Sequence, residues 1–377
     1  MTPPGHPDLA GHQQNLAVSY SDHFQRLGNV DDLESALKYF HGAVNATPLG
    51  HPDLAGCQQN LAICYAEQFE LFEDVADCHC ALYYFHASTK SQTSPPHILF
   101  DSATQWALLA QQHGLPECLD AYSKALQILP DLVWMGHVIK VRHEALLWHD
   151  IATLTAEGAA ACMQFDNLEL AVELLEQGLA VTYQQLLQLR DEFSVLHMNH
   201  PSLAQKLKQI SLQLQHCASQ TPSTLKESLT SSAYENNPHL LVLERNKLIR
   251  QIRNLPQFKQ FLLPSAYQTL CLAAQHGPIV MINCTASQSD AIILLSPSRP
   301  IQHVPFPGIS LQTAKEQLEI LRNAVIEARQ LDECHIHDQT KVQKGNIQEI
   351  LQGVVSWLWS MIVSPVFDAL QMASDFL

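Results

Sequence analysis

Large apolar residues recur at helical spacing in the first quarter of the chain. Two sets share steps of four, four and three residues: Leu16, Tyr20, Phe24 and Leu27, then Leu61, Tyr65, Phe69 and Phe72. These steps place one apolar side chain per turn on a single face of a helix. A second apolar face follows each set, with Ala36, Phe40 and Ala43 after the first and Ala81, Phe85 and Ser88 after the second. Each pattern therefore predicts a pair of consecutive helices that pack together.

Both patterns belong to an internal repeat. Residues 5–41 and 50–86 are identical at 21 of 37 positions when they are aligned at an offset of 45. Such a repeat is typical of helical arrays, in which each hairpin covers the apolar stripe of its neighbour. We therefore expect a mostly α protein that begins with an α-solenoid of helical hairpins. The stripes from Leu16 to Phe24 and from Leu61 to Phe69 should be buried between hairpins.

The second helices carry the landmarks of a known repeat. Steps of four, three and five residues connect Ala36, Phe40, Ala43 and Pro48, and again Cys118, Tyr122, Ala125 and Pro130. This pattern resembles the second helix of the tetratricopeptide repeat (TPR). The small residue of the TPR first helix resembles Ala17, Ala62 and Ala152, each 19 residues before Ala36, Ala81 or Ala171. A TPR has about 12 residues there, so the first helices should be about two turns longer.

The TPR-like repeats with their capping helices are expected to occupy residues 1–220. Four repeats fall at about 6–48, 51–93, 98–130 and 134–185, followed by a long helix through 184–193 and a further helix over 201–217. Cys217–Asn237 is rich in Ser, Thr and Asn, which predicts a bend. Residues 221–254 are therefore assigned to a linker and one helix at 238–253.

The hydrophobic period changes after residue 255. Three short apolar runs bounded by turn residues predict a meander of strands: Gly277–Cys284, Asp290–Leu295 and Pro300–Phe306. Helices are expected at about 310–332 and 345–361, and a short one from Pro365. Leu255–Pro264 resembles the start of a CHAT domain, the caspase-like peptidase domain associated with TPRs, and Trp357–Leu370 resembles a later segment of it. Residues 255–377 thus resemble the N-terminal part of a CHAT domain, a small α+β segment that lacks the catalytic half.

Composition points to a cytoplasmic protein. The ten cysteines show no disulfide framework, and Met1–Gly5 has neither a basic start nor an apolar run. The longest apolar stretch, Ile350–Val363, is too short to span a bilayer and should be a buried helix.

Charge is concentrated in the repeats. Residues 1–220 hold 24 Asp and Glu against 9 Lys and Arg, whereas residues 221–377 hold 13 against 12. An acidic array repels nucleic acid and anionic membranes and favours a basic protein or peptide as partner. The alternative is that the acidity only keeps the array soluble.

The CHAT resemblance implies a cysteine nucleophile and a histidine that exchanges a proton with it. In the family both residues lie beyond the segment that Trp357–Leu370 resembles, and this chain ends at Leu377. His276 precedes the first predicted strand and Cys284 ends it, about 25 Å away, so these two cannot share a proton. We therefore expect no catalytic residue and no enzyme activity.

The two tight clusters of metal-ligating types are Cys78–Cys80 and His335–Asp338. Each lacks the second pair of ligands that a structural zinc site needs, so no metal is expected. His6, His51, His41 and His86 fall at turns and helix ends of the repeats, where histidine more often caps or donates a hydrogen bond. No nucleotide-binding motif occurs, and no cofactor is expected.

The TPR resemblance directs attention to the first helices, which line the concave groove of that family. The position before the Leu or Trp of each first helix is occupied by Asn15, Asn60, Gln105 and Asp150. An amide can pair with the backbone of an extended peptide, so Asn15 and Asn60 are the predicted peptide-binding residues. The alternative is that they only bridge neighbouring helices.

These patterns together predict a protein–protein interaction scaffold built of TPR repeats, with an incomplete and inactive CHAT-like region. One alternative is a caspase-like cysteine peptidase precursor or fragment that needs a missing C-terminal half. Another is a structural adaptor unrelated to proteolysis.

Overall fold

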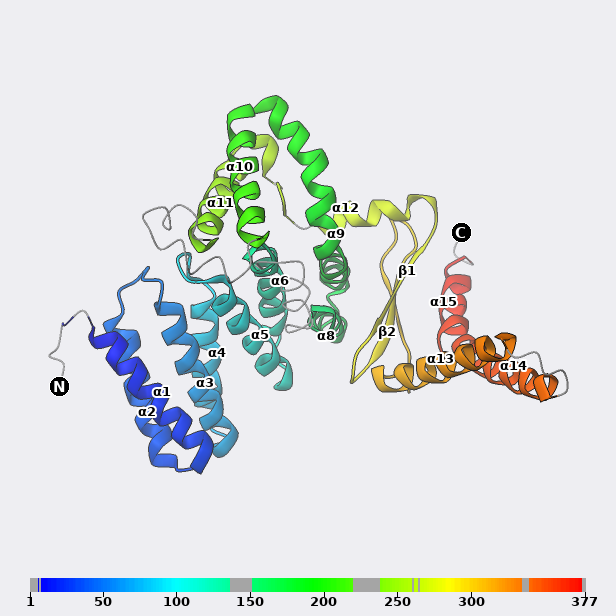
Figure 1. Cartoon of the computed structure of the whole chain (residues 1–377), viewed down its shortest axis with the longest axis horizontal. Coiled ribbons are helices and arrows are strands. Elements are labelled where there is room, and N and C mark those ends of the chain that lie inside the picture. Colours follow the sequence, from blue (N-terminus) through cyan, green and yellow to red (C-terminus); the bar gives the residue numbers. More distant parts are fainter. Residues whose placement is uncertain are drawn as a thin grey trace. The chain divides into compact units, whose positions relative to one another are not determined.

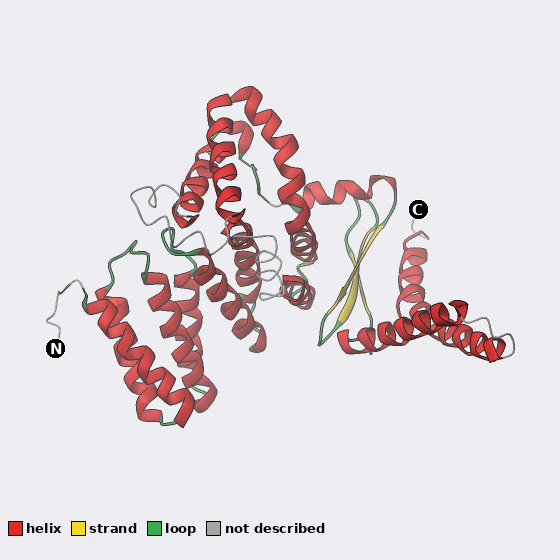
Figure 2. Ribbon diagram, in the orientation of Figure 1, coloured by secondary structure: helices red, strands yellow, loops and turns green. Residues whose placement is uncertain are grey.

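The computed structural model describes residue 6 and the ranges 8–135, 151–219, 238–259, 261–263, 265–333 and 339–374. These residues are mostly helical and include one small antiparallel sheet (Figure 2), as the sequence predicted. They divide into two compact units. The first unit combines Met1–Thr155 with Gln177–Pro264, and the second combines Ala156–Glu176 with Ser265–Leu377.

The first unit begins with three helical hairpins (Figure 1). Their helices are α1 (Leu9–Leu27), α2 (Val30–Ala46), α3 (Leu54–Phe72), α4 (Val75–Ser88), α5 (Pro96–Gln112) and α6 (Cys118–Met135). Each helix packs against the next one along the chain. α1 and α3 are 19 residues long, in agreement with the long first helices expected from the repeat spacing.

Small and aromatic residues of the second helices form the contacts between helices. Ala36, Phe40 and Ala43 are buried in α2, and their counterparts Ala81, Phe85 and Ser88 are buried in α4. Small residues at these positions let neighbouring helices approach closely, while the aromatic rings fill the space between them. The expected burial of the first-helix stripe holds only in part, since Leu61 is buried but Leu16 is 41% exposed. Ala152, the proposed counterpart of Ala17, is also exposed.

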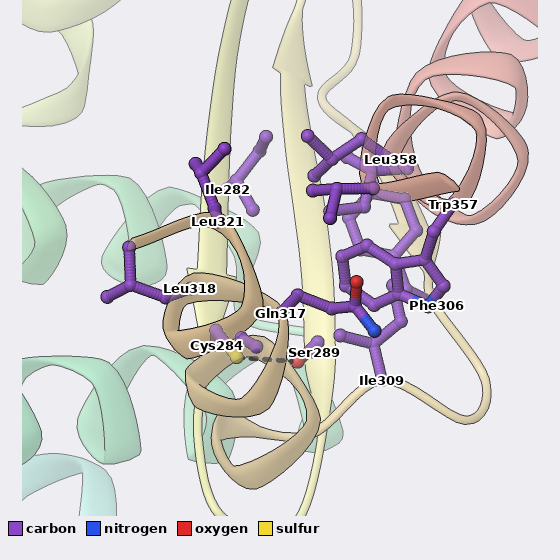
Figure 3. A pocket seen from close by; sticks show the side chains of 13 residues that line it. Ile282, Cys284, Ser289, Phe306, Ile309, Gln317, Leu318, Leu321, Trp357 and Leu358 are labelled. Atoms are coloured by element: carbon purple, nitrogen blue, oxygen red, sulfur yellow. Dashed lines mark hydrogen bonds between the residues drawn. The ribbon is translucent and has the colours of Figure 1, made fainter. Parts of the chain in front are cut away.

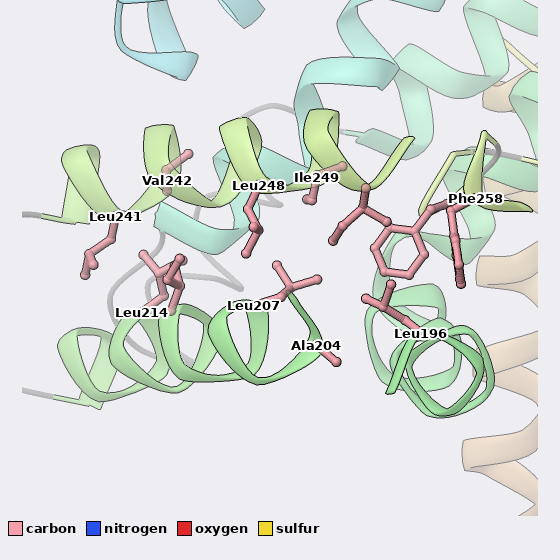
Figure 4. Close-up of a cluster of buried hydrophobic side chains, with 12 residues drawn as sticks. Leu196, Ala204, Leu207, Leu214, Leu241, Val242, Leu248, Ile249 and Phe258 are labelled. Atoms are coloured by element: carbon pink, nitrogen blue, oxygen red, sulfur yellow. The ribbon is translucent and has the colours of Figure 1, made fainter. Parts of the chain in front are cut away.

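A separate apolar core holds together the last part of the first unit (Figure 4). It joins the end of the long helix α9 (Leu168–Asn199) to α10 (Pro201–Ser219), α11 (Pro238–Arg253) and the short helix η1 (Pro256–Phe258). Phe258 and Phe261 belong to this core. The segment that resembles the start of a CHAT domain therefore packs with α10 and α11, and the first unit extends to Pro264 rather than ending near residue 220.

A polar contact joins α11 to α6. Asn246 donates a hydrogen bond from Nδ2 to Asp131 at 2.8 Å, and Arg245 lies 3.8 Å from the same carboxylate. Burial lowers the pKa of Arg245 to about 10, although the Asp131 charge opposes the shift. The two charges stabilise each other, because water cannot fully hydrate either side chain in this position.

The second unit is built on a three-stranded meander, β1 (Ile279–Cys284), β2 (Ser289–Leu294) and β3 (Gln302–Pro305). Its order is β1-β2-β3, with Ile282 opposite Ala291 and Ala291 opposite Val304. All of β2 is buried because both faces of the sheet are covered. The predicted meander is confirmed, and each strand differs from its predicted range by only a few residues.

Helical segments from distant parts of the chain cover the two faces. On one face, Asn283 donates to the carbonyl of Ala156 at 2.9 Å, and Gln288 donates to that of Ala160 at 3.3 Å. Both carbonyls belong to α8 (Ile151–Gln164), the first helix of the fourth predicted repeat. On the other face, Ala291 and Ile293 pack with residues near the C-terminus, among them Val366. Part of the fourth repeat thus belongs to the unit that holds the sheet.

The remaining helices are the short α12 (Tyr267–Leu270) and η2 (Cys271–His276) before the sheet, then α13 (Leu311–Glu333), α14 (Gln339–Leu358), the π-helical turn η3 (Trp359–Val363) and α15 (Ser364–Ser374) after it. The expected buried helix over Ile350–Val363 is wrong in its burial, because Val355 is 64% exposed and Trp359 is 57% exposed. By length and composition alone, Ile347–Leu370 could cross a membrane, and only 11% of its most apolar window is buried. Whether an apolar helix is buried depends on the segments that pack against it. The sequence of the helix alone does not specify those segments.

Candidate binding surface

The repeated His-Pro-Asp motif builds the turn that precedes α1 and α3. His6 Nδ1 accepts a hydrogen bond from the backbone N–H of Asp8, and His51 Nδ1 accepts one from Asp53, each at 3.2 Å. The imidazole therefore fixes the turn, in agreement with the expected capping role. The carboxylate of each motif remains largely exposed at the start of the helix, where a negative charge interacts favourably with the helix dipole.

A polar cavity of about 630 Å³ lies beside these two turns. Its walls come from the start of α1, the connection between α2 and α3, the first turn of α3 and one residue of α5. They include Asp8, His12, Gln14, Asn15, Thr47, His51, Asp53, Cys57 and Ile98. Amide, carboxylate and imidazole groups thus converge on one hollow formed by two neighbouring repeats.

The two predicted peptide-binding residues differ in exposure and in their position relative to the cavity. Asn15 is exposed and lines the cavity, and its backbone carbonyl accepts a hydrogen bond from Ser19. Asn60 is half-buried on α3 and does not line this cavity. Of the two other residues at this position of the predicted repeats, Gln105 is exposed on α5 and Asp150 lies outside the described residues. Gln14, the neighbour of Asn15, lines the cavity and was not singled out by the repeat pattern.

Two hydrogen bonds involve residues of one wall of the cavity. Thr47 donates from Oγ1 to the carbonyl of Ala43 at 2.7 Å, and Cys57 donates from Sγ to Oε1 of Gln14. Burial raises the pKa of the Cys57 thiol. The neutral thiol at neutral pH is therefore a hydrogen-bonding wall of the cavity and a poor nucleophile.

Stacked tyrosines join the two helices within a hairpin, and histidines of the second helices contact the following hairpin. Tyr20 stacks on Tyr39, and their repeat counterparts Tyr65 and Tyr84 stack in the same way, with ring centroids 5.7 and 6.0 Å apart. His41 Nε2 lies 2.6 Å from the hydroxyl of Tyr65. In the next repeat, His86 stacks on Trp106 with centroids 4.5 Å apart.

Burial lowers the pKa of both His41 and His86, so the neutral imidazole is favoured in the folded protein. Tyr39 and Tyr84, the second tyrosine of each pair, were not singled out from the sequence. Their recurrence at an offset of 45 residues could have indicated them.

The candidate metal and catalytic groups do not assemble. Cys78 is buried while His79 is exposed, so adjacent residues of this cluster point in different directions. Within the described part of the chain no group of three metal-ligating side chains occurs, and the His335–Asp338 cluster lies outside that part. His276 ends the short helix η2 that precedes β1, Cys284 is the last residue of β1, and Cys284 accepts a hydrogen bond from Ser289.

The repeat cysteines Cys64, Cys78 and Cys118 are buried and Cys80 is half-buried, and none of the four is activated. Burial raises the pKa of Cys64 to about 12 and that of Cys118 to about 11, and it also raises the pKa of Cys78 and Cys80. A thiolate nucleophile requires the opposite shift.

Comparison with known protein families finds no family that matches this chain, and comparison with curated proteins finds no matching relative.

Proposed function

We propose that the N-terminal helical hairpins form a TPR-like α-solenoid that binds an extended segment of a cytoplasmic partner protein. The polar cavity at the paired His-Pro-Asp turns carries this proposal. It places the amides of Gln14 and Asn15 beside the carboxylates of Asp8 and Asp53, in a space open to a ligand. We further propose that residues 255–377 are an incomplete CHAT-like region without peptidase activity.

The chemistry of the cavity favours a basic segment. Amide side chains can pair with the N–H and C=O groups of an extended backbone whatever its side chains are. The two exposed carboxylates attract lysine or arginine side chains, and the net charge of −15 on residues 1–220 extends that attraction beyond the cavity. Asn60 would contact the peptide further along α3.

Fluorescence anisotropy with a labelled Lys/Arg-rich peptide tests the proposal. The control peptide replaces every Lys and Arg with Gln. We expect binding of the basic peptide that weakens as salt is raised, because exposed charges are screened. Combining Asp8→Asn with Asp53→Asn should weaken binding about three- to tenfold. Asn15→Ala with Asn60→Ala should weaken it by about tenfold, as for two lost hydrogen bonds.

Gln127→Ala serves as the matched control, since it removes an exposed amide from the second helix α6. Equal binding of the two peptides, or equal loss with the control variant, would contradict the proposed site.

The absence of peptidase activity is tested separately. Incubation with an electrophilic, caspase-type covalent inhibitor should leave all ten cysteines unmodified. Stoichiometric modification of one cysteine, abolished by replacing a single histidine, would instead support the cysteine-peptidase alternative.

A further inference from the structure

The two outer strands of the sheet differ in how well they are protected from pairing. β3 has only four residues, and Pro300, Pro305 and Pro307 interrupt its edge with positions that lack an N–H. β1 has six residues, Ile-Val-Met-Ile-Asn-Cys, with no proline and no charge. Natural sheets protect exposed edges with prolines, charges or very short strands. β3 ends in a proline and is short, whereas β1 is longer and contains no proline, although Pro278 precedes it.

The stretch of sequence that contains β1 has no charged residue. No Asp, Glu, Lys or Arg occurs between Lys259 and Asp290, and Asp290 itself is buried against His303 at 2.7 Å. The strand itself therefore offers neither attraction to a charged strand nor repulsion toward another neutral one, and the charges nearby in sequence order on α13 include both signs, among them Lys315 and Glu319.

An apolar surface continues from this edge into a pocket. Figure 3 shows Ile282 of β1 beside Leu318 and Leu321 of α13, with Trp357 of α14 on another wall. The pocket measures about 300 Å³ and is lined almost entirely by apolar groups. Ile282 is 55% exposed and Leu318 is 48% exposed. Val280, two residues earlier, lies on the same face of the strand because side chains alternate.

We propose that β1 is a self-association edge, at which a second copy of this chain adds its own β1 in antiparallel orientation. A two-fold axis perpendicular to the sheet pairs the strand with itself and gives both copies the same contacts. Val280 and Ile282 of both copies then lie on one face as a continuous apolar stripe next to Leu318. The backbone groups of each outer edge become paired at the same time.

Other occupants fit the edge less well. A basic or acidic strand finds no opposite charge there, whereas an identical neutral strand meets no like charge. A lipid bilayer would cover the apolar side chains but leave the N–H and C=O groups of β1 unpaired, and such edges do not occur in contact with hydrocarbon. A second copy satisfies both the backbone and the side chains.

The paired surface is small, since it consists of one strand and the adjoining edge of α13. An interface of this size predicts a reversible dimer whose population rises with protein concentration. Analytical ultracentrifugation of the full chain over a concentration series should therefore show a species of twice the 42.1 kDa monomer mass.

Ile282→Lys places a charge on the exposed edge and should weaken dimerisation by about tenfold or more, because two like charges would then face each other across the axis. Val280→Lys should act in the same direction. The matched control is Val355→Lys, which introduces the same charge at another exposed apolar position of this unit, outside the pocket. Circular dichroism melts show whether each variant remains folded.

A measurement on the unmodified protein makes the test independent of the variants. Hydrogen exchange of the amides in residues 279–284 should slow as the concentration rises, since pairing protects the outer edge. A monomeric mass at all concentrations would overturn the proposal. It would also be overturned by association that leaves exchange in β1 unchanged, or by a monomer that binds neutral phosphatidylcholine vesicles with β1 exchange unaltered.

Discussion

Histidine occurs at two positions of the duplicated motif and makes a different contact at each. His6 and His51 accept a backbone N–H at a turn, whereas His41 and His86 lie against aromatic rings of the following hairpin. The first contact is local and has the same length, 3.2 Å, in both copies. The second crosses between hairpins, and its partner changes from Tyr65 to Trp106. At the scale of single residues, the histidines stabilise the turns and the contacts between hairpins. The amide of Asn15 and the carboxylates of Asp8 and Asp53 are exposed to solvent.

His41 should make the stability of the repeats depend on pH. Burial lowers its pKa from 6.5, so between that lower value and 6.5 the unfolded chain binds more protons than the folded one. Its contribution to the free energy of unfolding is therefore complete above about pH 6.5 and falls as the pH is lowered through this window. Thermal melts of the wild type and His41→Gln should diverge less at low pH than at neutral pH. An equal difference at both would contradict the assignment.

Phe40 and Leu16 provide a paired test of the packing. Phe40 is 2% exposed and should cost about 3–5 kcal/mol when replaced by Ala, as for a large core truncation. Leu16→Ala removes a side chain that is 41% exposed and should cost less than about 1 kcal/mol. Denaturant unfolding gives both values. Similar costs for the two substitutions would mean that the burial described for the second helices is incorrect.

At the scale of elements, the two copies of the repeat differ at one helix terminus. α1 ends with Gly28 in the left-handed region at φ 69°, where its N–H donates to the carbonyl of Phe24. α3 ends in the same way, but Glu73 occupies the left-handed position at φ 56° and donates to Phe69. Glycine adopts this conformation without steric cost, whereas a residue with a Cβ does not.

Glu73→Gly should therefore stabilise the protein, by roughly 1 kcal/mol, because it relieves the strain at the end of α3. Glu73→Ala keeps the Cβ and removes the same charge, so it separates the conformational effect from the electrostatic one. The chemical denaturation midpoint should rise only for the glycine variant. A rise of equal size for alanine would assign the effect to the charge.

Helices and strands were predictable where a local pattern specifies them. The steps of three and four residues gave α1 to α6, and the β-branched runs between turns gave β1 to β3. Exposure was less predictable, since it depends on which neighbours cover a face. Leu16 has the same local pattern as Leu61 but a different environment. Ile350–Val363 is apolar enough for a core helix. Its sequence does not show whether other segments cover its outer face.

At the scale of the whole molecule, the two compact units interleave along the chain. Residues 156–176 lie within the fourth predicted repeat but belong to the unit of the sheet. The sequence placed a boundary near residue 220 because composition changes there, and another at 255 because a family resemblance begins. Spatial contacts cannot be read from either signal. Asn15 could be proposed from the repeat alone, while the cavity that surrounds it required the three-dimensional arrangement of two repeats.

Asn283 tests the interleaving. Its Nδ2 donates to the carbonyl of Ala156, and the side chain is 3% exposed. Asn283→Ala should cost about 1 kcal/mol, since it removes the hydrogen bond of a buried amide to the half-buried segment of Ala156. Hydrogen exchange should then accelerate together in residues 156–164 and in β1. Acceleration in β1 alone would show that the two segments do not form one cooperative unit.

The central claim is that the N-terminal repeats bind an extended basic segment at the paired turns. Hydrogen exchange with and without the saturating Lys/Arg-rich peptide measures this most directly. We expect slower exchange confined to the start of α1 and the start of α3, around Asn15 and Asn60, and no change with the Gln-substituted peptide. Protection elsewhere in the repeats, or no protection at saturation, would contradict it.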